Sequence, residues 1–116
     1  MPYEFFLELL FPLSLRHKKM FGVDSYYIGE KIVFALRKKD NLLEDNGIWI
    51  ASKIEYHQKL KHKIRGLNAI KSYGIKSWLV LPEEFEYFEE EANKLSELIK
   101  KNSVLVGNIP KTKNKR

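Results

Sequence analysis

The segment between residues 15 and 37 constrains the fold of this chain more than any other part of its sequence. Apolar and polar residues alternate there in short runs, which is typical of β-strands because successive side chains point to opposite faces. Gly22 and Gly29 interrupt the runs where tight turns need a positive backbone φ angle, and Gly29-Glu30 fits a two-residue hairpin turn. The pattern predicts three antiparallel strands, over residues 15–21, 25–28 and 31–37.

Apolar side chains in the predicted strands indicate where the core lies. Two further apolar runs of strand length follow at residues 48–51 and 77–81, and each contains one tryptophan. We expect Trp49 and Trp78 to pack in the core, because burial of a large aromatic side chain is strongly favourable; a ligand platform is the alternative. In the third strand, the side chains predicted to share the core face are Ile32, Phe34 and Leu36.

Two helices are predicted from apolar residues at three- and four-residue spacing. Residues 3–11 form the first, with Phe5 and Phe6 among its apolar side chains, and Pro12 ends it. The second follows Pro82 and is long and amphipathic. Glutamates crowd its first turns and lysines close it, a polarity that complements the helix dipole. Its apolar stripe is predicted to pack on the sheet and consists of Phe85, Phe88, Ala92, Leu95 and Ile99.

A further helix is predicted to begin at Lys53. Ser52 and Glu55 have the spacing of a capping box, in which the serine hydroxyl accepts a helical N–H and the glutamate reaches back to the serine N–H. Gly66 is expected to end or kink the helix. The apolar stripe is narrow, so most of the helix surface is polar; the stripe consists of Ile54, Leu60, Ile64 and Leu67.

Length and composition fit a single domain. The chain has 116 residues, of which 44% are hydrophobic and none is cysteine, so its core can form without disulfide bonds. We predict that residues 1–110 form this domain. Residues 104–107 are expected to form a last short strand or a tucked segment. Residues 111–116 are predicted to be a basic, disordered tail.

The sequence contains no pattern that indicates catalysis. His57 and His62 are five residues apart, whereas two ligands on one helical face need a spacing of three or four. We therefore expect these residues and His17 to be ordinary histidines, not zinc ligands. Nucleophile elbows, phosphate-binding loops and cysteine nucleophiles are also missing. We predict a non-enzymatic protein that uses no metal and no cofactor.

A run of basic residues is the main functional signal. The net charge of the chain is +6, and a positive protein attracts phosphate groups and other anions. Between residues 53 and 76, Glu55 is the only acid. We predict that the basic side chains of this stretch contact the phosphates of a nucleic acid. The predicted site residues are Lys53, Lys59, Lys61, Lys63, Arg65, Lys71 and Lys76.

Spacing along the predicted helix sharpens this hypothesis. Residues four apart share one face, so the basic side chains form two ridges away from the apolar stripe. The ridges are Lys59 with Lys63, and Lys61 with Arg65. Tyr56 and Tyr73 are expected to stack or pack beside them. Because lysine outnumbers arginine here, and arginine is the usual reader of bases, we expect binding that does not depend on nucleotide sequence.

Two alternatives to nucleic-acid binding stay open. A charge-rich helix face can be solvated surface, on which lysine serves solubility. The same positive charge could also engage an acidic protein partner, which would make the chain a protein-interaction domain. A salt titration of binding to unrelated duplexes would separate the nucleic-acid hypothesis from both.

Two regions resemble the TfoX N-terminal domain and related MmcQ/YjbR-like domains. Residues 19–36 contain a Met-Phe-Gly corner, a Gly-x-Lys turn and a Phe-Ala-Leu strand. Residues 78–111 contain Trp-Leu-Val-Leu-Pro, an acidic helix with Glu-Leu-Ile, and Val-Gly-Asn-Ile-Pro-Lys. The resemblance implies that residues 1–110 form an α+β domain, an antiparallel β-sheet with helices packed against it. It also implies a loose association with DNA or transcriptional regulation. It implies no catalytic residues, and Gly22 and Gly29 are expected to be corners of the fold.

Membrane and export signals are not expected. No apolar run approaches the roughly 20 residues of a membrane-spanning helix. The first residues carry an acid, Glu4, and no basic region, so they do not resemble a signal peptide. A cysteine-free chain also suits a reducing compartment. We therefore predict a cytoplasmic protein without a membrane partner.

Overall fold

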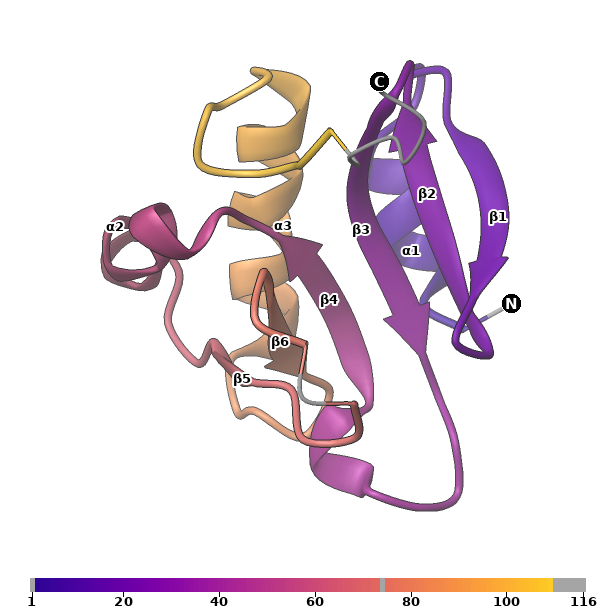
Figure 1. Ribbon diagram of the computed structural model, residues 1–116, viewed down its shortest axis with the longest axis vertical. Coiled ribbons are helices and arrows are strands. Elements are labelled where there is room, and N and C mark those ends of the chain that lie inside the picture. The colour runs from indigo at the N-terminus through magenta and orange to yellow at the C-terminus, as the bar shows by residue number, and fades with distance from the viewer. Residues whose placement is uncertain (1, 74, 110–116) are drawn as a thin grey trace, which may run out of the picture.

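The computed structural model describes residues 2–73 and 75–109 and has an α+β fold (Figure 1). Its six strands form one antiparallel sheet in the order β1-β2-β3-β4-β6-β5. The strands are β1 Arg16–Met20, β2 Val23–Ile28, β3 Lys31–Arg37, β4 Gly47–Ala51, β5 Asn68–Ala69 and β6 Trp78–Pro82. The helices are α1 Glu4–Leu9, α2 His57–Lys63 and α3 Phe88–Lys100, with 3₁₀ turns η1 Leu43–Asp45 and η2 Ile54–Tyr56. The predicted fold class is confirmed.

Both predicted turns of the first three strands are present. Met20 lies opposite Val23, and the two residues between them have positive φ angles, 53° at Phe21 and 76° at Gly22. In the next hairpin Ile28 lies opposite Lys31, and Gly29 has a φ of 60°. Positive φ angles match the right-handed twist of the strands, so these short turns hold β1, β2 and β3 in register.

A β-bulge in β3 changes which side chains face the core. Tyr26 pairs with Phe34 and Tyr27 with Ile32, so Val33 is an extra residue in β3. A bulge of this kind interrupts the alternation of side chains along a strand. Phe34 therefore packs in one core cluster and Ile32 in the other. The prediction that Ile32 shares the face of Phe34 and Leu36 is wrong, whereas the predicted burial of Phe34 is confirmed.

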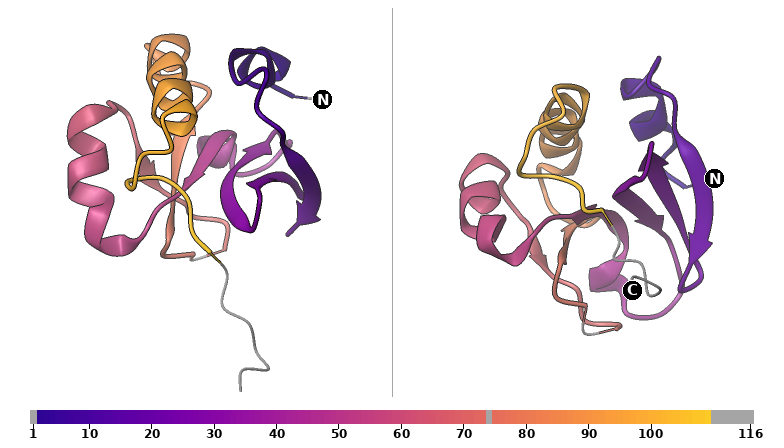
Figure 2. Two further views of the ribbon diagram at one scale, coloured as in Figure 1. Left: turned by 90° about the horizontal axis from the view of Figure 1, so that it is seen from above. Right: turned by 45° about the horizontal axis from the view of Figure 1, so that its top comes forward.

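Helices α1 and α3 cover one face of the sheet. In both views of Figure 2, α3 lies between α2 and α1. The ring of Phe6 meets Phe34 at 5.1 Å between centroids, and Phe5 meets Phe88 at 5.9 Å. The predicted stripe of α3 is buried at Phe88, Ala92, Leu95 and Ile99. Phe85 precedes the helix and is only partly buried, because the chain turns at residues 83–87 before α3 begins.

The opposite face of the sheet carries both tryptophans. Trp49 is fully buried and Trp78 is 6% exposed, which confirms the predicted core packing. The indole N–H of Trp49 donates to the carbonyl oxygen of Asp45 at 2.9 Å. The buried Asp45 carboxylate accepts the backbone N–H groups of Lys71, at 3.0 Å, and Ser72, at 2.6 Å, together with the Ser72 hydroxyl. These hydrogen bonds hold the β5–β6 connection over this face.

The beginning of α2 differs from the prediction. Ser52 is buried, and its hydroxyl donates to the carbonyl oxygen of Leu105 at 2.7 Å, so it does not cap a helix. Lys53 is extended, and η2 comes between it and α2. Ile54 is 60% exposed and does not belong to the apolar stripe. The rest of the stripe is buried, at Leu60, Ile64 and Leu67.

The last described segment is tucked against the sheet. Leu105 and Val106 are buried, and the N–H of Gly107 donates to the carbonyl oxygen of Ala51 at 2.6 Å. Asn108 forms an isolated bridge with Ile32. The tucked alternative for residues 104–107 is therefore confirmed, while the predicted tail at 111–116 lies outside the described residues. None of the helices within 2–73 and 75–109 is long and apolar enough to cross a membrane.

Candidate nucleic-acid interface

All seven predicted site residues are exposed. The six lysines form no ion pair with any residue that the structure describes. We call them the lysine surface: Lys53, Lys59, Lys61, Lys63, Lys71 and Lys76. Their charge is not neutralised within the described chain, so the surface is available to an anionic partner.

Helix α2 positions the centre of the lysine surface. Leu60 is fully buried, which turns Lys59, Lys61 and Lys63 toward solvent. Lys59 and Lys63 are one helical turn apart, as predicted. The second predicted ridge does not form, because α2 ends at Lys63 and Ile64 is extended, with φ −124° and ψ 117°.

Arg65 is the predicted residue that the structure separates from the lysines. Its Nε donates to Oε2 of Glu91 at 2.9 Å, and its backbone N–H donates to Oε1 of the same carboxylate at 2.9 Å. A second ion pair joins Arg65 to Glu90 at 3.2 Å, and the guanidinium lies 4.4 Å from the ring centre of Tyr87. Arg65 therefore joins the end of α2 to α3, and we leave it out of the interface.

The charge of Glu91 depends on Arg65. Glu91 is completely buried on α3, and burial by itself would raise the pKa of its carboxyl group. The backbone N–H and guanidinium of Arg65, together with the ammonium of Lys94, outweigh burial and hold the pKa below its usual range. The hydrogen bond to Glu91 also raises the pKa of Arg65. The pair is therefore ionised near neutral pH.

Two lysines from different segments of the basic stretch line one cavity. Lys61 of α2 and Lys76 of the β5–β6 connection line a hollow of about 420 Å³ between α2 and the β5–β6 edge of the sheet. His57 lies at the same cavity, and its Nε2 is hydrogen-bonded to the carbonyl oxygen of Ser52 at 2.9 Å. The remaining described lining is apolar and includes Trp78. The cavity could not be predicted from the sequence, because its walls come from η2, α2, β5, β6 and the β5–β6 connection.

The other lysines lie around this centre. Lys71 follows β5, and its backbone is anchored on Asp45 while its side chain stays exposed. Lys53 lines a separate hollow of about 220 Å³ with Lys31 of β3. The structure thus brings Lys61 and Lys76 together at one cavity, places Lys59 and Lys63 on the same helix as Lys61, and puts Lys53 at a different hollow.

Neither predicted tyrosine stacks beside the lysines. Tyr56 packs against the main core cluster. Tyr73 stacks on Phe21, with 5.0 Å between ring centroids, and its hydroxyl donates to the Phe21 carbonyl oxygen at 2.9 Å. This contact joins the β5–β6 connection to the corner between β1 and β2. Tyr73 therefore has a structural contact with Phe21 and does not extend the lysine surface.

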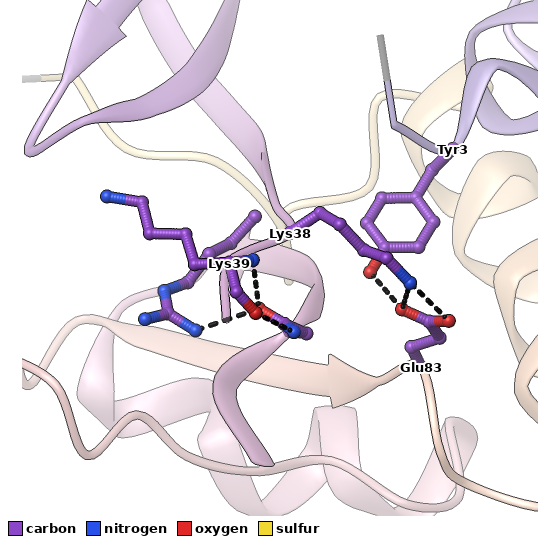
Figure 3. Close-up of polar contacts among 6 residues, drawn as sticks. Tyr3, Lys38, Lys39 and Glu83 are labelled. Atoms are coloured by element: carbon purple, nitrogen blue, oxygen red, sulfur yellow. Dashed lines mark hydrogen bonds and ion pairs between the residues drawn. The ribbon is translucent and has the colours of Figure 1, made fainter. Parts of the chain in front are cut away.

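A second charged site was not predicted from the sequence. Glu83, directly after β6, accepts hydrogen bonds from the Tyr3 hydroxyl and from Nζ of Lys38, both at 2.6 Å. Figure 3 shows Tyr3 and Lys38 converging on Glu83, while the side chain of Lys39 points away. The hydrogen bonds from Lys38 and Tyr3 lower the pKa of Glu83, whereas burial and Glu83 raise the pKa of Tyr3. The contact ties α1 to the ends of β3 and β6.

Known proteins do not assign a function to either site. Comparison of the chain with family models, with curated proteins and with solved structures found no match. Among residues 2–73 and 75–109, no group of three or more His, Cys, Asp or Glu side chains is placed to hold a metal ion. A functional proposal therefore depends on the residues and their arrangement.

Proposed function

We propose that this protein is a non-enzymatic, nucleic-acid-associated accessory domain that binds phosphate groups through its lysine surface. The observation that carries the proposal is the lack of internal ion pairs: six exposed lysines have no acidic partner among the described residues. Basic side chains that neutralise phosphates release condensed counterions, and this release drives binding. The resemblance to TfoX N-terminal and YjbR-like domains supports the same proposal, and a cytoplasmic location would give access to nucleic acid.

Binding through lysine should be independent of sequence. The ammonium group is a point charge that contacts phosphates, whereas specific recognition depends on hydrogen bonds to base edges. We expect affinity for unrelated DNA duplexes in the non-specific range, about 10⁻⁴–10⁻⁶ M at physiological salt, with a steep fall as salt rises.

The decisive test changes two lysines of α2. The double variant Lys59→Glu, Lys63→Glu should weaken binding to every duplex alike, as measured by fluorescence anisotropy at several salt concentrations. The matched control, Lys18→Glu with Lys101→Glu, changes the net charge equally at two exposed lysines outside the lysine surface. Equal weakening in both variants would mean that total charge, not the lysine surface, determines binding.

Truncation after Pro110 controls for the basic tail. This variant should keep most of the affinity if the lysine surface is the binding site. If the protein bound neither DNA nor RNA at low salt, nucleic-acid binding would be rejected. The expected partner would then be an acidic protein surface, for which the same lysines have the complementary charge.

A further inference from the structure

Basic and apolar side chains together line the cavity between α2 and the β5–β6 edge. Lys61, Lys76 and His57 line the cavity, and none of its described lining residues is acidic. The rest of the lining is apolar and includes Ile54 and Ile75. The floor of a cavity of this kind can bury a flat apolar group, and its cations can hold an attached anion.

Two details indicate that the apolar part is open to a ligand. Ile54 is 60% exposed, which leaves a large aliphatic side chain uncovered beside the lysines. Trp78 is nine-tenths buried, but its indole N–H has no acceptor among the described residues, so it is free to donate to a ligand or to water. A duplex that contacted the lysines only through its phosphates would leave this apolar surface exposed to water.

We infer that the cavity accepts an unpaired base, so that the lysine surface binds single-stranded nucleic acid in preference to duplexes. This inference rests on the proposed function and names its ligand. A nucleotide joins a flat ring to an anionic phosphate, which matches an apolar floor beside two lysines. In a duplex the bases are stacked inside the helix and cannot enter the cavity, whereas a single strand can turn a base outward.

The other lysines support a strand rather than a free nucleotide. Lys59 and Lys63 share α2 with Lys61, and Lys71 shares the β5–β6 connection with Lys76. Lys59, Lys63 and Lys71 add three cations outside the cavity, on the two segments that carry its lysines. This added charge favours a polyanionic strand over a single nucleotide, as in other proteins that combine basic side chains with base contacts.

The test compares a labelled oligothymidylate with a duplex of the same length. The wild-type protein should bind the single strand at least about fivefold more tightly, since one base contact contributes roughly 5- to 150-fold by substitution. Ala69→Phe adds a bulky group at the cavity and leaves every charge in place. It should abolish this preference without changing duplex affinity. The control is Lys59→Glu with Lys63→Glu, which should weaken both ligands.

Tryptophan fluorescence provides a readout that does not depend on the cavity variant. Oligothymidylate should quench the emission of the wild-type protein, and Trp78→Phe should remove the quenching because Trp49 is buried away from solvent. Equal affinity for both ligands, or quenching that survives Trp78→Phe, would overturn the inference while duplex binding still supported the proposed function. Absence of binding to either ligand would overturn both.

Two further ligands distinguish a single strand from other occupants of the cavity. Thymidine 5′-monophosphate should quench much more weakly than the oligonucleotide at the same concentration, because it cannot contact the neighbouring lysines. Equal quenching would show a site for free nucleotides and reject the single-strand inference. Quenching by polyglutamate, without quenching by the oligonucleotide, would reject it in favour of an acidic protein partner.

Discussion

Arg65 and the lysines of α2 are neighbours in the sequence and are all exposed, but they differ in whether an acidic side chain pairs with them. Arg65 is held by Glu91 and Glu90, whereas Lys61 and its neighbours have no described acidic partner. The acids that pair with Arg65 lie 26 and 25 residues further along the chain. Whether a basic residue in such a stretch forms an ion pair therefore depends on acidic residues that only the fold brings close to it.

The same distinction separates Lys38 from the lysine surface. Lys38 pairs with Glu83, which is 45 residues away in the sequence. Paired cations hold elements of this fold together, and unpaired cations leave positive potential at the surface. Substitutions in the two sets should therefore have opposite profiles: the paired set should affect stability, and the unpaired set should affect ligand binding.

The largest effect on stability is expected at Glu91. Glu91→Ala should lower the free energy of unfolding by about 2–3 kcal/mol, because the backbone N–H of residue 65 loses its acceptor and a buried side chain leaves a gap. Urea unfolding measures the change. Glu90→Ala is the matched control on the same helix turn, since Glu90 is exposed, and it should change stability by less than about 0.5 kcal/mol. Equal effects would mean that burial of Glu91 does not matter.

The pH dependence of stability should show the same ion pair. The pKa of Glu91 is lower in the folded protein than in the unfolded chain, where glutamate titrates near about 4.3. Its stabilising contribution is therefore complete above the unfolded pKa and is lost as the pH falls through the folded pKa. Between about pH 6 and pH 3, Glu91→Gln should lose less stability than the wild-type protein.

Other carboxyl groups limit the size of that difference. Asp24 and Glu83 also have lowered pKa values, so the wild-type protein and the variant should both lose stability in acid. Parallel curves for the two proteins, measured by urea unfolding at each pH, would contradict the role assigned to Glu91.

Removal of Lys38 should have a smaller effect. Lys38→Met keeps the aliphatic length of the side chain and removes its ion pair with Glu83, which is partly exposed at both ends. We expect a loss of about 0–1 kcal/mol, because solvent screens such pairs. Thermal unfolding checks this, with Lys39→Met as the control, since the side chain of Lys39 points away from Glu83 (Figure 3). A loss well above this range would place Lys38 among the main stabilising contacts.

The lysine surface should have the smallest effect on stability. Lys59→Ala with Lys63→Ala should leave the free energy of unfolding within about 0.5 kcal/mol, because neither side chain has a described partner. The same variant should reduce the salt dependence of nucleic-acid binding, by about one in the logarithmic slope for each lysine that contacts a phosphate. A large loss of stability with an unchanged slope would reverse the distinction between the two sets.

Sequence patterns were sufficient where contacts are local. The turns at Gly22 and Gly29 need positive φ angles, and the neighbouring residues alternate, so the first three strands could be predicted. The stripe of α3 could be predicted for the same reason, because its residues repeat along one helix. The bulge at Val33 could not, since the register between β2 and β3 depends on how both strands pack.

The burial of two polar side chains could not be predicted from the sequence either. Ser52 matched a capping box, but Leu105 comes close enough in the fold to take its hydroxyl hydrogen bond. Asp45 is a buried anchor of the β5–β6 connection, a role that no sequence pattern predicted. At Ser52 a partner from a distant segment competes successfully with the local interaction that the sequence suggests.

The sequence by itself determined the class of fold and the excess of positive charge between residues 53 and 76. Backbone preferences and side-chain periodicity act over a few residues, so both can be recognised in a single chain. Only the tertiary structure decided that Arg65 is bound to Glu91, and that Lys61 and Lys76 meet at a cavity beside Trp78. Ion pairs and cavities need groups from distant segments at distances of a few ångströms, and only packing of the complete domain sets those distances.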